Sequence, residues 1–137
     1  MISRRIFSSC GLCAAMGLIA APVEAQAQAA AGGVTRRIVS REDVPGGVYE
    51  TVQAVATVEA GALVIRHTHP GIESSFILEG GGTLAVKGRD SAMVEAGSSF
   101  MIPPETPHLL LNGGKLTRIA STYVVEKGKP LAAPAPE

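Results

Sequence analysis

The stretch GALVIRHTHPGIE, residues 61–73, joins a β-prone apolar run to two histidines, a turn and a carboxylate. Residues two apart in a strand point to the same face, so His67 and His69 can direct both imidazoles into one interior. A proline–glycine pair then turns the chain, and Glu73 follows at the start of the next run. From there its carboxylate can reach back toward the imidazoles. The stretch therefore predicts two strands that bring three ligand-bearing side chains together.

The third and last histidine, His108, follows the sequence PPETP about forty residues later, and only a closed fold brings it to the first pair. Three neutral imidazoles and one carboxylate suit a divalent transition metal: Mn, Fe, Co, Ni, Cu or Zn. We therefore expect one such ion, held by His67, His69, Glu73 and His108. Without a cysteine ligand, a closed structural zinc site is not expected. The alternatives are exposed histidines, and a Glu73 that orients a histidine N–H instead of binding metal.

Outward from this stretch, short β-prone runs alternate with turn residues, and no segment has a convincing helical period. Short strands at such regular spacing are typical of an all-β sandwich or barrel, because a sheet of about eight strands must bury one face. The predicted strands cover residues 49–58, 62–67, 75–78, 83–87, 92–95, 99–102, 108–111 and 116–125.

Two motifs in this order resemble those of the cupins, and every histidine of the chain falls on a motif position. The first motif, G-(x)5-H-x-H-(x)3,4-E-(x)6-G, is matched by Gly61, His67, His69, Glu73 and Gly80. The second motif, G-(x)5-P-x-G-(x)2-H-(x)3-N, is matched by Gly97, Pro103, His108 and Asn112. Glu105 stands where that motif usually has glycine, which we expect either to strain the turn or to place a carboxylate near the mouth of the site.

The chain thus resembles the small single-domain bacterial cupins of the RmlC-like, type 2 group, over residues of about 50–125. The resemblance implies a double-stranded β-helix, or jelly roll, around the metal. We expect Asn112 to be structural and the motif glycines to occupy turns with positive φ. Four apolar residues are expected to be core or pocket wall: Phe76, Phe100, Met101 and Ile102.

The resemblance fixes the reaction less well than the fold, because cupins include enzymes and binding domains. We expect a mononuclear metal-dependent oxidoreductase, dioxygenase-like, that acts on a small molecule, with Glu73 as a candidate base. The alternative is a non-catalytic periplasmic protein that binds a metal or a small ligand. The sequence supports this alternative because it has no insertion long enough to form a lid and few aromatic residues to hold a substrate.

Residues 1–27 have the features of a secretory signal: a positive start, a short apolar run and small residues at its exit. The apolar run is shorter than the roughly 20 residues that span a bilayer. Ser3-Arg4-Arg5-Ile6-Phe7 resembles the twin-arginine motif, and an ordinary Sec signal is the alternative. We therefore expect a periplasmic protein. Cleavage would also remove both cysteines, Cys10 and Cys13, so their C-x-x-C spacing is not expected to form a redox site.

The rest of the 137-residue chain is expected to form one domain, with a flexible lead-in over 28–45, the cupin barrel over 46–126 and a proline-rich tail over 127–137. The 12 basic residues balance the 12 acidic ones and tryptophan is absent, which argues against a nucleic-acid partner. The expected partner is a small molecule, with no membrane contact after cleavage. A homodimer that covers an exposed sheet edge is a further expectation.

Overall fold

A computed structural model describes residues 27–137, and the predicted signal segment therefore lies almost entirely outside the described residues. Within the described range the secondary structure is all β, as predicted, and no helix there is long and apolar enough to cross a membrane. The strands are β1 (Ala27–Ala31), β2 (Val34–Asp43), β3 (Tyr49–Val58), β4 (Leu63–Thr68), β5 (Gly71–Glu79), β6 (Gly81–Val86), β7 (Ala92–Glu95), β8 (Ser99–Ile102), β9 (His108–Asn112), β10 (Thr117–Glu126) and β11 (Ala133–Pro134).

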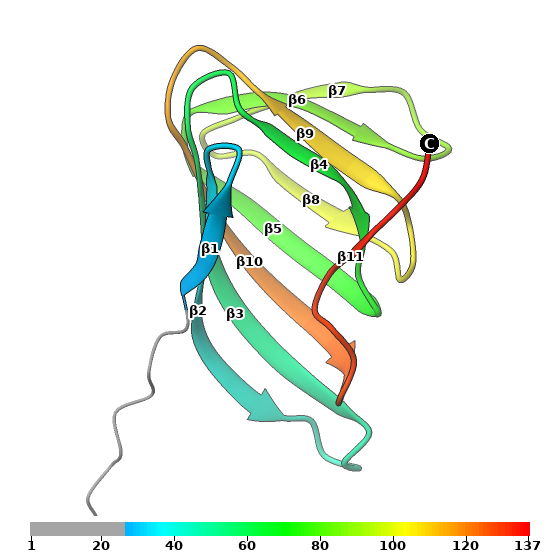
Figure 1. Ribbon diagram of the computed structural model, residues 1–137. Helices are drawn as coiled ribbons and strands as arrows, with labels where there is room; N and C mark the ends of the chain where they lie inside the picture. The colour runs from blue at the N-terminus through cyan, green and yellow to red at the C-terminus, as the bar shows by residue number, and fades with distance from the viewer. Residues whose placement is uncertain (1–26) are drawn as a thin grey trace, which may run out of the picture.

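The strands form two antiparallel sheets that face each other (Figure 1). One sheet has six strands in the order β1-β2-β3-β10-β5-β8, and the other has five in the order β11-β4-β9-β6-β7. Consecutive strands β4 and β5 lie in different sheets, as do β8 and β9, so the chain crosses between the layers repeatedly. This arrangement confirms the predicted jelly roll.

The interior is layered, as the inward face of β10 illustrates. Its buried residues alternate with more exposed ones because successive strand residues point to opposite faces. Ile119 belongs to the larger apolar cluster, Tyr123 belongs to a second and smaller cluster, and buried Ser121 lies between them in sequence. The polar level around Ser121 contains the histidines and Glu73, so an apolar core adjoins the candidate site on both sides along this strand.

Several motif residues have the structural roles predicted for them. Gly61, Gly80 and Gly97 have φ values of 70°, 72° and 90°. At Gly80 a Cβ would approach the carbonyl oxygen of Leu116 to 2.4 Å, so a side chain is excluded there on steric grounds as well. The Asn112 amide donates to three backbone carbonyls, those of Val58, Glu59 and Lys115, and fastens the loops at this end of the fold.

Glu105 adopts a φ of 53°, the left-handed conformation that the glycine of the motif would adopt without cost. Its backbone N–H donates to the His69 carbonyl oxygen at 2.9 Å. The turn between β8 and β9 is therefore kept in its glycine-like shape by a residue with a side chain, and it is bonded directly to a predicted metal ligand.

Three predictions need correction. The flexible lead-in over 28–45 is largely strand, since β2 pairs with β3 along most of its length. The proline-rich tail is not free of strand structure, because its Ala133–Pro134 segment pairs with β4 as β11. Phe76 and Met101 are not core residues, since they are 46% and 63% exposed. On β5 and β8 the next residues along the chain, Ile77 and Ile102, point inward instead.

Candidate metal centre

The structure brings the four predicted ligands together inside the fold. His67 lies near the end of β4, His69 follows that strand, Glu73 is on β5 and His108 begins β9. One potential ligand atom from each lies within 4.8 Å of all the others. All four residues are buried, with exposed fractions between 1% and 8%. The ligands come from both sheets, so the closure of the jelly roll is what assembles the group.

Each imidazole is fixed through its Nδ1 atom by a backbone carbonyl. The distances are 2.7 Å from His67 to the Ile65 oxygen and 2.9 Å from His108 to the Thr106 oxygen. His69 donates over a much longer sequence separation, to the Leu131 oxygen at 2.6 Å. A carbonyl oxygen can only accept, so Nδ1 is the protonated nitrogen in each ring. Each neutral ring therefore has its lone pair on Nε2, the form in which histidine binds metals.

The Nε2 atoms face a carboxylate oxygen that also has only lone pairs. Glu73 Oε2 lies 3.0 Å from His69 Nε2 and 3.2 Å from His108 Nε2. With the rings in their neutral form, His69 Nε2 and Glu73 Oε2 are buried atoms without a hydrogen-bond partner in the described part of the chain. Leaving such atoms unpaired costs on the order of 1–3 kcal/mol each. A cation bound between them would satisfy both.

The second oxygen of Glu73 is held away from this point. Oε1 accepts a hydrogen bond from Ser75 Oγ at 2.6 Å, and Ser121 Oγ lies 3.4 Å away. The two hydroxyl oxygens are themselves 2.6 Å apart. Ser75 and Ser121 therefore fix the carboxylate so that Oε2 points at the imidazoles. Sequence reasoning missed both serines, although their positions on inward strand faces are the signal that marks them.

The protonation states suit a cation as well. Burial, and then the cost of placing a second positive charge beside the His108 ring, lower the pKa of His67 to about 4, so this ring is neutral at neutral pH. Burial alone would raise the pKa of Glu73, but interactions with His108 and His69 outweigh burial and lower it. Glu73 is therefore an anion among imidazoles, and the four side chains fit a divalent transition metal in donor type and in charge.

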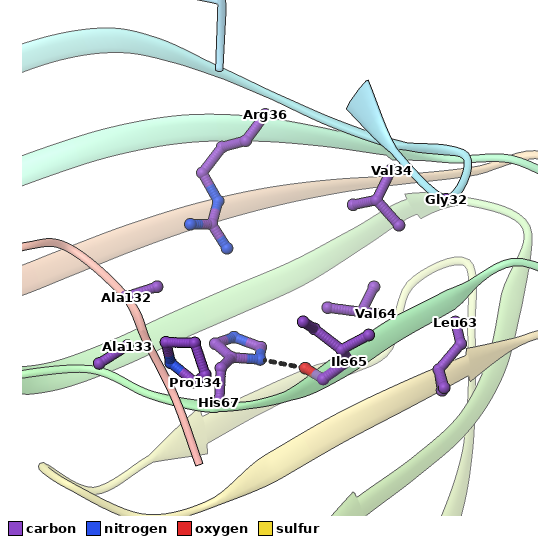
Figure 2. A pocket seen from close by; sticks show the side chains of 10 residues that line it. All are labelled: Gly32, Val34, Arg36, Leu63, Val64, Ile65, His67, Ala132, Ala133 and Pro134. Atoms are coloured by element: carbon purple, nitrogen blue, oxygen red, sulfur yellow. Dashed lines mark hydrogen bonds between the residues drawn. The ribbon is translucent and has the colours of Figure 1, made fainter. Parts of the chain in front are cut away.

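A cavity of about 410 Å³ adjoins this group between β2, β4 and the C-terminal segment (Figure 2). His67 lines the cavity and also lines a smaller hollow of about 40 Å³ that contains Glu73 and His108. The cavity wall is mainly aliphatic, from residues such as Leu63, Ile65 and Pro134, and Arg36 projects into it from β2. The candidate centre thus has one side that faces a space large enough for a small organic molecule.

Two more residues near the centre escaped sequence reasoning. Tyr123 is buried with its ring centroid 4.7 Å from that of His69, and burial together with the charge of Glu73 raises its pKa to about 12. Arg36 lies with its guanidinium carbon 5.9 Å from the Tyr123 ring centroid. The alternation of β10 marks Tyr123 as inward-facing, whereas nothing marked Arg36, because its segment was interpreted as a flexible lead-in.

Comparisons with known proteins agree with the fold. The sequence matches the cupin domain family over residues 54–128, and no curated protein matches it significantly. An RmlC-like cupin from Shewanella frigidimarina has a similar structure, with a TM-score of 0.60 and 18% identity over 77% of this chain and 87% of that one. A cupin-like protein from Thermotoga maritima gives a TM-score of 0.61 and 20% identity, covering 77% of each chain.

A third similar structure is the polyketide cyclase RemF from Streptomyces resistomycificus, with a TM-score of 0.61 and 22% identity over 83% of this chain and 82% of that one. At such identities the likeness is one of fold. The family match covers more than half of the sequence and includes all four residues of the candidate centre. The chain therefore belongs to the cupin domain family.

Proposed function

We propose that this protein is a mononuclear metal-binding cupin that acts as an oxidoreductase, dioxygenase-like, on a small molecule. The observation that supports the metal is the convergence of three Nε2 lone pairs and one carboxylate oxygen in a buried site, with each Nδ1 already bonded to a carbonyl. Rings fixed in this way need little reorganisation to bind an ion.

Enzymatic activity is supported by the cavity beside His67. A divalent ion with four protein ligands has positions left for other molecules, and when bound it polarises an oxygen ligand as a Lewis acid. The aliphatic wall would offer apolar contacts to a substrate in the cavity. Within this proposal Ser75 and Ser121 keep Glu73 in place as a ligand, and a shift of Glu73 from ligand to base would require it to leave both hydroxyls.

The second candidate is a protein that binds a metal or small ligand without turnover. One observation favours it: among the cavity-lining residues that the structure describes, there is no carboxylate or hydroxyl side chain to act as acid or base. The chemistry of a catalyst would then depend on the metal and its ligands alone.

Elemental analysis of the purified protein, followed by oxygen-uptake assays, tests the proposal. We expect close to one transition-metal ion per chain, absent from a His67→Ala, His69→Ala double variant. The metal-loaded protein should consume dioxygen with an enediol, flavonol or diketone substrate. A full metal load together with ligand-induced thermal shifts, but without turnover on any substrate class, would favour the binding protein. A chain that binds no transition metal would refute the metal centre and leave only a protein that binds a small ligand.

We also propose that the protein is exported in folded form by the twin-arginine route, on the strength of Arg4 and Arg5 in their motif context. Changing both to lysine should abolish export while leaving synthesis intact, as measured by fractionation and immunoblotting. Unchanged export of that variant would instead indicate the Sec route.

A further inference from the structure

The cavity beside the candidate metal centre contains one permanent charge, that of Arg36. Figure 2 shows its guanidinium extending from β2 into the cavity, across from His67 on β4. Of the other lining residues, all except His67 are glycine, alanine, proline or aliphatic. Successive residues of a strand point to opposite faces, so Arg36 on β2 faces inward while Arg37 is exposed on the other face.

Arg36 lacks the partner that a partly buried guanidinium normally has. Its Nε is buried with no hydrogen-bond acceptor, and no carboxylate of the described residues lies within 4 Å of it. Arg41, further along the same strand, does form such a pair, with Glu50 at 2.7 Å. An unpaired charge beside a largely apolar cavity wall is unfavourable, and an anion bound in the cavity would pair it.

The local charge balance also favours an anion. Arg36 lies close to the candidate centre, since it lines the same cavity as His67 and its guanidinium carbon is 5.9 Å from the centroid of the Tyr123 ring. Within the ligand group only Glu73 is negative. A divalent ion would add two positive charges, so the occupied centre and its cavity would carry a clear positive excess.

We propose that this cavity binds a small organic anion, a carboxylate or an enolate, whose charged end pairs with Arg36 beside the metal centre. Its apolar part would lie against Leu63, Ile65 and Pro134. A planar guanidinium suits such a ligand because it can form two parallel hydrogen bonds to one carboxylate. The inference rests on the proposed function only in that it places a metal ion next to the bound anion. The anion site itself consists of Arg36 and the cavity wall.

Isothermal titration with a matched pair of probes tests the inference. Hexanoate and hexanamide have the same chain length and differ in charge. Each is titrated into zinc-loaded and metal-free protein in a buffer without other carboxylates, phosphate or sulfate. Zinc is chosen because it has no redox chemistry that would consume the probe. We expect hexanoate to bind at least 10-fold more tightly than hexanamide to the zinc-loaded protein.

Three variants assign the effect to Arg36. Arg36→Met should abolish the preference for hexanoate, and Arg36→Lys should retain part of it, because lysine keeps the charge but not the planar fork. Arg37→Met is the matched control, since that side chain faces outward on the same strand, and it should leave the preference intact. Zinc content should be the same in all four proteins.

The outcomes separate the inference from the proposed function. Equal affinities for the two probes, or a preference that survives in Arg36→Met, would overturn the anion site. If the wild-type protein binds no zinc, the metal proposal fails, and the inference is then decided by whether metal-free protein shows an Arg36-dependent preference. If Arg36→Met does not fold, Arg36→Lys decides: an unchanged preference contradicts the bidentate pairing, and a reduced one supports it.

Discussion

At the scale of single residues, the candidate centre depends on hydrogen bonds that leave one atom of each side chain free. Three Nδ1 atoms and one carboxylate oxygen are bonded to other groups, and the remaining ligand atoms converge. The ligand types could be predicted from the sequence, because H-x-H and a following glutamate leave few other functions for these residues. The supporting groups could not, since two of them are backbone carbonyls two residues before their histidines and one belongs to Leu131, 62 residues away from His69.

Ser75 provides a direct test of this support. Its hydroxyl holds Glu73 Oε1 at 2.6 Å, and Ser75→Ala would release the carboxylate from its fixed orientation. Loss of such an orienting partner typically lowers metal affinity 10–100-fold, and we expect about 10-fold here because Ser121 remains nearby. Ser74→Ala is the control, since Ser74 lies on the opposite face of β5. Competition with a chelator measures both affinities, and equal values for the two variants would contradict the orienting role.

His67 predicts how the stability of the metal-free protein depends on pH. Its pKa is lowered from 6.5 to about 4 by burial and by His108, so between these values the unfolded chain binds a proton that the folded chain does not. The free energy of unfolding should therefore fall as the pH falls from 6.5 to 4, by up to about 3 kcal/mol. Urea denaturation across this range measures the slope. A His67→Gln variant should have a flatter profile, and an identical slope in both proteins would show that another group is responsible.

At the scale of strands, the sequence predicted those strands that have buried apolar residues and missed those that do not. Strands β3, β7 and β8 match their predicted ranges, because alternating or continuous apolar residues mark a face that must be covered. β2 has no fully buried residue, so its charged sequence lacks that signal and resembles a loop. β2 becomes a strand because it pairs with β3, and that pairing cannot be predicted from the sequence of β2 alone. The sequence therefore gives no sign that Arg36 faces the cavity.

β11 shows how a minor element can act on the centre. The C-terminal segment pairs with β4 opposite Thr68 and His67, and the Leu131 carbonyl accepts the Nδ1–H of His69. Removing residues 130–137 would leave that buried N–H without its acceptor. We expect metal affinity to fall about 10-fold, with the β-sheet circular dichroism retained. Removing only Pro136 and Glu137, which lie beyond β11, is the control. Unchanged affinity in the longer truncation would exclude the segment from the site.

At the scale of the whole molecule, the four candidate metal ligands come from both sheets. Glu73 belongs to the six-stranded sheet, whereas His67 and His108 belong to the five-stranded one. The sequence could predict this closure because His108 is too far from the other ligands in the chain to reach them in any open arrangement. It could not predict that β1 and β11 form sheet edges, since both strands are short and lack a hydrophobic pattern.

Because an ion bound there would connect both sheets, removing it should destabilise the entire fold. Binding to the folded state alone stabilises by RT ln(1 + [L]/Kd), about 2.7 kcal/mol at a free metal concentration of 100 times Kd. For a domain of this size that corresponds to a rise in Tm of roughly 10 °C. Calorimetry of metal-free protein with and without zinc measures the shift in Tm.

Glu73→Gln should reduce this shift strongly, because the ligand from the six-stranded sheet loses its charge. Glu79→Gln is the control, since Glu79 is exposed at the end of the same strand. An equal shift in wild type and Glu73→Gln would mean that the ion does not bridge the sheets.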